Sequence, residues 1–186
     1  MGPMGQSAAD KARFTSVVVP HLADAFALAR WLTGNRADAE DIVQDASLRA
    51  YRAINTYSGG SARAWLLTIV RNTAYTWLAK NTSAALVSLD GASSAERDLI
   101  EGAQGLNRTN AVTPETELIS KMDATRLEAA ITSLPIEFRE AFVLREIHGF
   151  NYRQISEITS MPLGTVMSRL ARARRRLIEA VGIEHT

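Results

Sequence analysis

Apolar residues recur at three- and four-residue steps in both halves of the chain, and a 35-residue stretch between them, residues 86–120, lacks this periodicity. Spacing of this kind is typical of amphipathic helices, and no strand-length run alternates apolar and polar residues. A loop so long is improbable inside one compact domain. The sequence therefore predicts an all-α fold, with two small helical domains over 10–85 and 121–183 and a flexible linker over 86–120.

The first domain is predicted to be a bundle of three helices. An amphipathic pattern covers residues 14–32 and stops at Gly34, because glycine commonly follows the last helical turn. Either Asn35 or Asp38 can cap the second helix. The expected elements are helices over 14–32, 38–56 and 64–80, with a loop at 58–61.

The second domain shows four shorter helical patterns. Pro135 ends the first of them or restarts the chain, since proline lacks the N–H that a helix interior needs. Gly149 separates the next two, and a turn over 160–162 precedes the last. The expected helices cover 121–134, 136–145, 152–158 and 163–180.

Several classes of site find no support in the composition. The chain has no cysteine and three histidines, which lie far apart in the sequence without the spacing of metal ligands. No nucleophile with a base, glycine-rich phosphate loop or metal cluster stands out, so we expect neither an enzyme nor a cofactor. No apolar run is long enough to span a membrane, and a cytoplasmic protein is expected.

Charge is unevenly distributed although the formal net charge is only +1. Residues 163–178 contain five arginines and no acid, whereas residues 38–45 contain four acids and no base. The linker carries six acids and two arginines. The two ends of the chain therefore favour different partners.

The basic segment forms two distinct faces when it is drawn as a helix. At 100° per residue, one face is apolar and a separate flank is polar and basic. The apolar face comprises Val166, Leu170, Ala173 and Leu177, and the flank comprises Thr165, Ser168, Arg169, Arg172 and Arg176. A short helix, a tight turn and a basic helix make up a helix-turn-helix reader of DNA.

Arginine suits such a reader because its planar guanidinium can bind guanine O6 and N7 with two hydrogen bonds. Thr165, Ser168 and Arg169, near the start of the helix, are placed for base edges. Phosphate contacts, which are independent of base sequence, are expected from Arg172, Arg174, Arg175 and Arg176. The alternative is a solvated charged helix, which is common in any protein.

Residues 134–174 resemble region 4 of extracytoplasmic-function (ECF) sigma factors of the sigma-70 family. The motifs are Leu134-Pro135, FREAF over 138–142, YRQISEI over 152–158 and GTVMSRLARAR over 164–174. The resemblance implies that the basic helix binds the minus-35 promoter element. Three positions depart from the family: Ser156 replaces a usual alanine, Ser160 a frequent glycine, and Met167 a common polar or basic residue.

The segment DAEDIVQD over 38–45 is similar to region 2 of the same family. This resemblance implies that Asp41, Gln44 and Asp45 bind the β′ clamp helices of core RNA polymerase, and the family also contacts the β flap. Residues three and four apart share one helix face, so the three side chains can meet one partner. An acidic first turn favoured by the helix dipole is the alternative, and it explains Gln44 and Asp45 poorly.

The segment YSGGSARAWLLTIVRN over 57–72 resembles the part of region 2 that captures an unstacked base of the minus-10 element. Such a site needs hydrogen-bond donors and aromatic surface for a base removed from its stack. The residues implied are Tyr57, Ser58, Ser61, Arg63, Arg71, Asn72, Tyr75 and Lys80. Two features depart from the family: Ala62 replaces a frequent aromatic residue, and Lys80 is the sole basic residue between 73 and 85.

The resemblance implies a sigma factor that directs core polymerase to promoter DNA and is held inactive by an anti-sigma factor. The acidic linker of such a protein enters the polymerase channels, although a solvated tether explains its composition equally well. Two alternatives remain open. One is a helix-turn-helix regulator with a sensory first domain, and the other is a sigma-like mimic that binds an inhibitor and never touches DNA.

Overall fold

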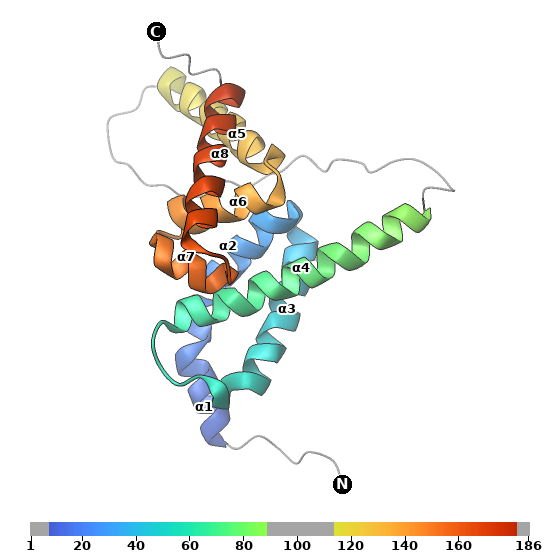
Figure 1. Ribbon diagram of the computed structural model, residues 1–186, viewed down its shortest axis with the longest axis vertical. Helices are drawn as coiled ribbons and strands as arrows, with labels where there is room; N and C mark the ends of the chain where they lie inside the picture. Colours follow the sequence, from blue (N-terminus) through green and yellow to red (C-terminus); the bar gives the residue numbers. More distant parts are fainter. Residues whose placement is uncertain (1–7, 89–113, 182–186) are drawn as a thin grey trace.

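The computed structural model describes residues 8–88 and 114–181, and all regular elements in these two ranges are helical (Figure 1). We refer to residues 8–88 as the N-terminal module and to residues 114–181 as the C-terminal module. The N-terminal elements are α1 (Ala8–Val17), η1 (Val19–His21), α2 (Leu22–Thr33), α3 (Arg36–Ala53), η2 (Ile54–Thr56) and α4 (Ala62–Ser88). The C-terminal elements are α5 (Pro114–Ser133), α6 (Ile136–Phe142), η3 (Val143–Ile147), α7 (Tyr152–Thr159) and α8 (Leu163–Val181). The predicted all-α fold of two helical units is confirmed.

The first predicted helix is interrupted in the structure. Instead of one helix over 14–32, α1 and α2 are separated by the short 3-10 turn η1, which has Pro20 in its first positions. Proline has no N–H to continue an α-helical hydrogen-bond ladder, so the chain bends at this point. The prediction of one continuous helix is therefore wrong at its centre, although Val18 and Leu32 are both buried in the core as the pattern indicated.

The boundary between α2 and α3 follows from two local preferences. Gly34 ends α2 in the left-handed region at φ 73°, where residues with a Cβ are strained. The side chain of Asn35 then accepts hydrogen bonds from the backbone N–H groups of Ala37 and Asp38. Of the two predicted caps, Asn35 is therefore the one used.

Helices α4 and α5 both extend beyond the predicted limits. The third helix, expected over 64–80, runs from Ala62 to Ser88, and α5 begins at Pro114. Both ends of the predicted linker are thus helical. The remaining linker residues, 89–113, lie outside the described part of the chain.

The C-terminal module packs α8 against α5, α6 and α7. The predicted apolar face of α8 is buried, since no more than 6% of any of its four side chains is exposed. Those residues are Val166, Leu170, Ala173 and Leu177. The helical-wheel prediction for this segment is therefore confirmed, and the arginine flank is left on the outside.

The turn between α7 and α8 uses two of the serines that depart from the family pattern. Ser160 ends α7 in the left-handed region at φ 55°, a conformation that favours glycine. The Ser156 hydroxyl donates a hydrogen bond to the carbonyl oxygen of Met161. At its other end α7 begins with a capping box, in which Asn151 and Gln154 satisfy each other's backbone N–H groups.

The two modules contact each other directly. Helix α2 packs against α6, and α4 packs against α7. Figure 1 shows α4 crossing below the C-terminal module, with α5 and α8 side by side above it. Within the described ranges, no helix combines the length and apolar character needed to cross a membrane.

Candidate nucleic-acid interface

Helix α8 presents its arginines beside a buried apolar face. Arg172 and Arg175 are exposed, and the guanidinium of Arg176 lies 5.3 Å from the ring centroid of Phe138. Arg174 donates a 2.6 Å hydrogen bond to Glu146, which follows α6 in the chain. The segment therefore carries a cluster of positive charge on the outside of the C-terminal module, as the sequence predicted.

The first turns of α8 hold the residues assigned to base edges. Ser168 is exposed and Thr165 and Arg169 are partly buried. The Ser168 hydroxyl donates to the carbonyl oxygen of Thr165, a local bond that does not tie it to another element. The structure thus places these three residues together at one end of α8.

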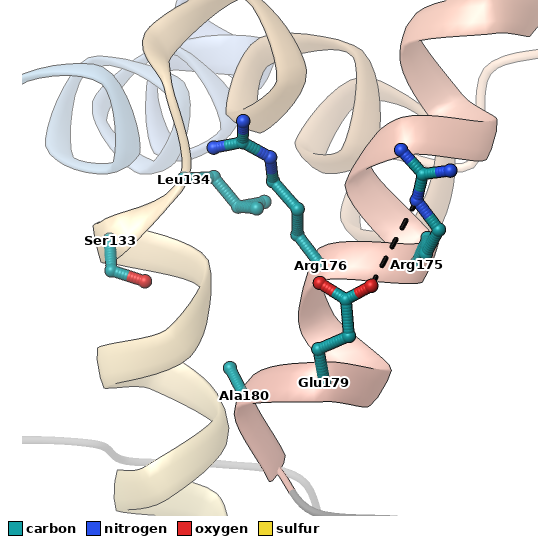
Figure 2. Close-up of a pocket in the computed structure, with 6 residues that line it drawn as sticks. All are labelled: Ser133, Leu134, Arg175, Arg176, Glu179 and Ala180. Carbon is teal, nitrogen blue, oxygen red and sulfur yellow. Dashed lines mark ion pairs between the residues drawn. The ribbon is translucent and has the colours of Figure 1, made fainter.

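An open groove lies between the end of α5 and the last turns of α8 (Figure 2). Arg175 and Arg176 line it from α8, opposite Ser133 and Leu134. Glu179 is the acidic group in this groove, and it lies 4.0 Å from the Nε of Arg175. An exposed pair of this kind adds little stability, so the Arg175 guanidinium can exchange Glu179 for another anion.

Asp41, Gln44 and Asp45 lie together on an exposed face of α3. The Asp45 carboxylate accepts a hydrogen bond from Arg49, one turn further along the helix. Burial raises the pKa of Asp38, and the nearby charge of Asp41 adds to the increase. The predicted polymerase-binding residues therefore form one polar, mainly acidic surface on the N-terminal module.

The loop before α4 holds the first three of the residues assigned to minus-10 DNA. Tyr57 packs its ring 5.3 Å from that of Trp65, and its hydroxyl donates to the carbonyl oxygen of Gly60. Ser61 caps α4 by accepting a hydrogen bond from the N–H of Ala64. Ser58 is exposed. The loop is therefore held in shape by its own side chains.

Arg63, at the start of α4, joins the two modules. Its guanidinium donates to both carboxylate oxygens of Asp24 at 2.7 and 3.1 Å, and to the carbonyl oxygen of His148 at 2.6 Å. The bond to Arg63 lowers the pKa of Asp24. Burial lowers the pKa of His148 to about 4, so its imidazole is neutral at pH 7.

Arg71 and Tyr75, two further minus-10 candidates on α4, meet Glu140 of α6. The Arg71 Nε donates to the carboxylate at 2.6 Å and the Tyr75 hydroxyl donates at 3.1 Å. The Glu140 side chain is fully buried. Burial, reinforced by the Glu140 charge, raises the pKa of the Tyr75 phenol, which stays protonated and serves as a donor.

The remaining two candidates on α4 face outward. Asn72 is exposed and accepts a hydrogen bond from Arg71, and Lys80 is exposed near the far end of the described side chains. The predicted minus-10 residues therefore include both exposed side chains and side chains that contact the C-terminal module. Ser58, Ser61, Asn72 and Lys80 are exposed, whereas Arg63, Arg71 and Tyr75 contact the C-terminal module.

Sequence reasoning did not single out Glu140, Arg139 or His148 as contact residues. Arg139 donates hydrogen bonds to the carbonyl oxygens of Trp31 and Leu32 at the end of α2. A charged pair in the middle of an otherwise apolar motif, FREAF, was the available signal, because buried charges require partners. Among the described residues, no three His, Asp or Glu side chains gather as metal ligands would.

Comparison with protein families gives two matches, one in each module. Residues 17–84 match Sigma-70 region 2, and residues 124–177 match Sigma-70, region 4. The two matches cover the acidic face of α3, the α4 residues and the arginines of α8. They also lie in the order that the sequence motifs indicated.

Proteins with similar amino-acid sequences are described as ECF RNA polymerase sigma factors. The sigma-E factor of Escherichia coli K12 is 36% identical over 75% of this chain and 72% of its own length. The sigma-E factor of Haemophilus influenzae is 33% identical over 77% and 74%. SigE of Mycolicibacterium smegmatis is 32% identical over 87% of this chain, which spans 58% of that protein.

Solved structures agree with the fold. The sigma factor RpoE of Bartonella quintana, in complex with the anti-sigma factor NepR, is similar with a TM-score of 0.75 and 28% identity. That similarity covers 92% of this chain and 98% of RpoE. CnrH, solved with the cytosolic domain of CnrY, shares the fold at a TM-score of 0.60 and 20% identity, over 92% of this chain and 89% of CnrH.

Proposed function

The chain belongs to the ECF sigma factors of the sigma-70 family, and from this membership we propose that it directs core RNA polymerase to specific promoters and initiates transcription there. Sigma factors are initiation factors and not enzymes, so bond formation belongs to the polymerase. The supporting observation is that one chain carries both family regions, each with a surface of the right chemistry. Asp41 lies on the acidic surface, in region 2, and Arg172 lies on the basic surface, in region 4.

The N-terminal unit, residues 10–85, fastens the protein to polymerase and captures minus-10 DNA. Asp41, Gln44 and Asp45 bind the β′ clamp helices. A polar, acidic, exposed helix face suits a partner with complementary charge, which raises the association rate and fixes the docking orientation. The loop and α4 then hold the unstacked base through Tyr57, Ser58, Ser61, Arg63, Arg71, Asn72, Tyr75 and Lys80.

The C-terminal unit, residues 121–183, binds minus-35 DNA and the β flap, and residues 86–120 connect the two units. The exposed flank of α8 enters the major groove, where Thr165, Ser168 and Arg169 meet base edges. Arg172, Arg174, Arg175 and Arg176 bind phosphates. Their contribution is independent of sequence and weakens as salt rises.

An anti-sigma factor regulates the protein. Support comes from RpoE of Bartonella quintana, which was solved with the anti-sigma factor NepR and is similar to this chain over nearly all of its length. The chain has no cysteine, so sensing through thiols or zinc–thiolate sites would reside in the inhibitor. We place the protein in the cytoplasm, where polymerase and chromosome are found.

The test is transcription by core polymerase reconstituted with the purified chain on genomic DNA, followed by sequencing of transcript 5′ ends. We expect discrete start sites preceded by two shared sequence elements. A helix-turn-helix regulator would bind DNA without supporting initiation by core polymerase. A sigma-like mimic would give neither start sites nor DNA binding, and either result would overturn the proposal.

A further inference from the structure

Three residues assigned to minus-10 DNA contact the C-terminal module through hydrogen bonds. Arg63 donates to His148, and both Arg71 and Tyr75 donate to Glu140. These are donors of the kind that a phosphate or a base edge would accept. The surface proposed for promoter DNA is therefore partly occupied by the protein itself.

Both carboxylate oxygens of Glu140 accept hydrogen bonds from side chains of α4, as the oxygens of a bound anion would. Its Oε1 accepts from the Arg71 Nε at 2.6 Å, and its Oε2 accepts from the Arg71 Nη2 at 3.4 Å and from the Tyr75 hydroxyl at 3.1 Å. The Arg71 guanidinium also lies 4.4 Å from the ring centroid of Tyr75. A carboxylate with no exposed surface needs such partners, because an unpaired buried charge is strongly unfavourable.

The two guanidinium nitrogens that bind Glu140 are on the edge with which arginine binds phosphate in a bidentate manner. While Glu140 holds this edge, Arg71 cannot offer it to DNA. Arg169 of α8, assigned to minus-35 bases, lies close enough to Tyr75 for its charge to oppose the rise in the pKa of that phenol. One contact region thus involves candidate residues for both promoter elements.

We propose that Glu140 is an internal competitor for promoter DNA, which holds the two modules in a closed state until they separate and release Arg71 and Tyr75. The inference rests on the proposed function, because it assigns Arg71 and Tyr75 to DNA. It adds a regulatory role for a residue of the C-terminal module that is assigned to neither promoter element.

Three further hydrogen bonds between the modules are made to backbone carbonyl oxygens, which suits a contact that opens. Arg63 donates to the backbone of His148, and Arg139 donates to the backbone of Trp31 and Leu32. Water can replace such hydrogen bonds when the modules part, so their net contribution is modest. Contacts between domains of one chain are commonly of this separable kind.

The test compares Glu140→Gln with Glu157→Gln in the full chain. Both changes remove one negative charge from the C-terminal module, but Glu157 is exposed on α7 and pairs with Arg153 at 3.5 Å within the same helix. The probe is a 20-nucleotide single-stranded DNA of mixed sequence at two salt concentrations. Because binding is weakened by the fraction of closed molecules, we expect E140Q to bind about tenfold more tightly than E157Q.

Distance measurement supplies an independent readout. The chain has no cysteine, so labels attach only at Asn55→Cys and Ala171→Cys, both exposed and in different modules. We expect the mean distance between labels to increase in E140Q and to stay at the wild-type value in E157Q. Equal DNA affinity of the two variants, or a longer distance without tighter binding, would overturn the proposal. If E140Q loses its helical circular dichroism, Glu140→Asp replaces it in every measurement, because the shorter side chain cannot reach both partners.

Transcription separates this inference from the proposed function. If the wild-type chain initiates with core polymerase but E140Q and E157Q bind DNA equally, the protein is a sigma factor without this internal competitor. If no variant initiates, the proposed function fails. The comparison of DNA affinity and label distance still decides whether Glu140 holds the modules closed.

Discussion

Arg63 donates a 2.6 Å hydrogen bond to the carbonyl oxygen of His148, a residue 85 positions further along the chain. A second guanidinium nitrogen approaches the His148 Nδ1 at 3.1 Å. An arginine can donate to this nitrogen only if the imidazole is unprotonated there, which agrees with the lowered pKa of His148. The hydrogen bond from Arg63 to the His148 ring therefore needs an imidazole without a proton on Nδ1, whereas a proton on this nitrogen would face Asp24 at 3.6 Å.

The lowered pKa of His148 predicts that the folded protein is less stable at acidic pH. The pKa of His148 is about 4 in the folded state and 6.5 without the fold, so between these values the unfolded chain binds a proton that the folded chain excludes. The free energy of unfolding should consequently fall as pH decreases through this window. From pH 7 to pH 5 we expect a loss of about 2 kcal/mol from this group.

Urea unfolding of the wild type and His148→Gln at pH 7 and pH 5 measures this effect. Because glutamine does not titrate, the variant should lose most of the pH dependence, whatever its stability at pH 7. Equal slopes in the wild type and His148→Gln would contradict the assignment of a neutral, buried imidazole.

A second prediction concerns the turn before α8. Ser160 occupies the left-handed region at φ 55°, which costs about 1 kcal/mol for a residue with a Cβ and nothing for glycine. Glycine also adds freedom to the unfolded chain, which offsets part of the gain. We expect Ser160→Gly to raise the free energy of unfolding by up to about 1 kcal/mol in a urea titration. The same change at Ser168, inside α8, should lower it by about 0.5 kcal/mol, and a loss of stability at both sites would refute the argument.

Local patterns predicted the helices well where the signal lies within a few residues. The four buried positions of α8 follow from its periodicity, and Pro135 separates α5 from α6 as expected. The break at Pro20 was missed because apolar spacing continues through it, although proline was the visible signal. The capping box of Asn151 and Gln154 was also present in the sequence and unused.

The contact between Arg71 and Glu140 could not be predicted from the sequence, for a physical reason. The two residues are 69 positions apart, and neither helical periodicity nor spacing indicates how one helical unit sits on another. The family motif assigned Arg71 to a DNA-binding surface. That assignment gave no sign that Glu140 is the partner of Arg71 in the structure. Only the three-dimensional arrangement shows that a buried carboxylate occupies the same guanidinium.

A third prediction separates base reading from phosphate binding on α8. Arg169 is partly buried near the start of the helix, whereas Arg175 is exposed further along. Arg169→Ala should cost about 1–3 kcal/mol on promoter DNA and much less on a scrambled duplex. Arg175→Ala should weaken binding to both duplexes equally and reduce the salt dependence. Equal losses on promoter and scrambled DNA for Arg169→Ala would contradict its assignment to a base.

The last prediction concerns the exposed face of α3. If Asp41, Gln44 and Asp45 bind core polymerase, Asp41→Asn and Asp45→Asn should each weaken that binding about tenfold, because they remove charges that meet a complementary surface. Fluorescence anisotropy of labelled protein titrated with core enzyme measures the affinity directly.

Glu40→Gln is the matched control, since it removes the same charge from the same helix. Glu40 pairs with Arg36 at 2.9 Å and lies about 100° around the helix from Asp41 and about 140° from Asp45, on the side of Gln44. Loss of affinity in Glu40→Gln as large as in Asp41→Asn would mean that polymerase senses only the total charge of α3. Selective loss in the two aspartate variants, with helical content unchanged, would instead locate the docking surface on one side of the helix.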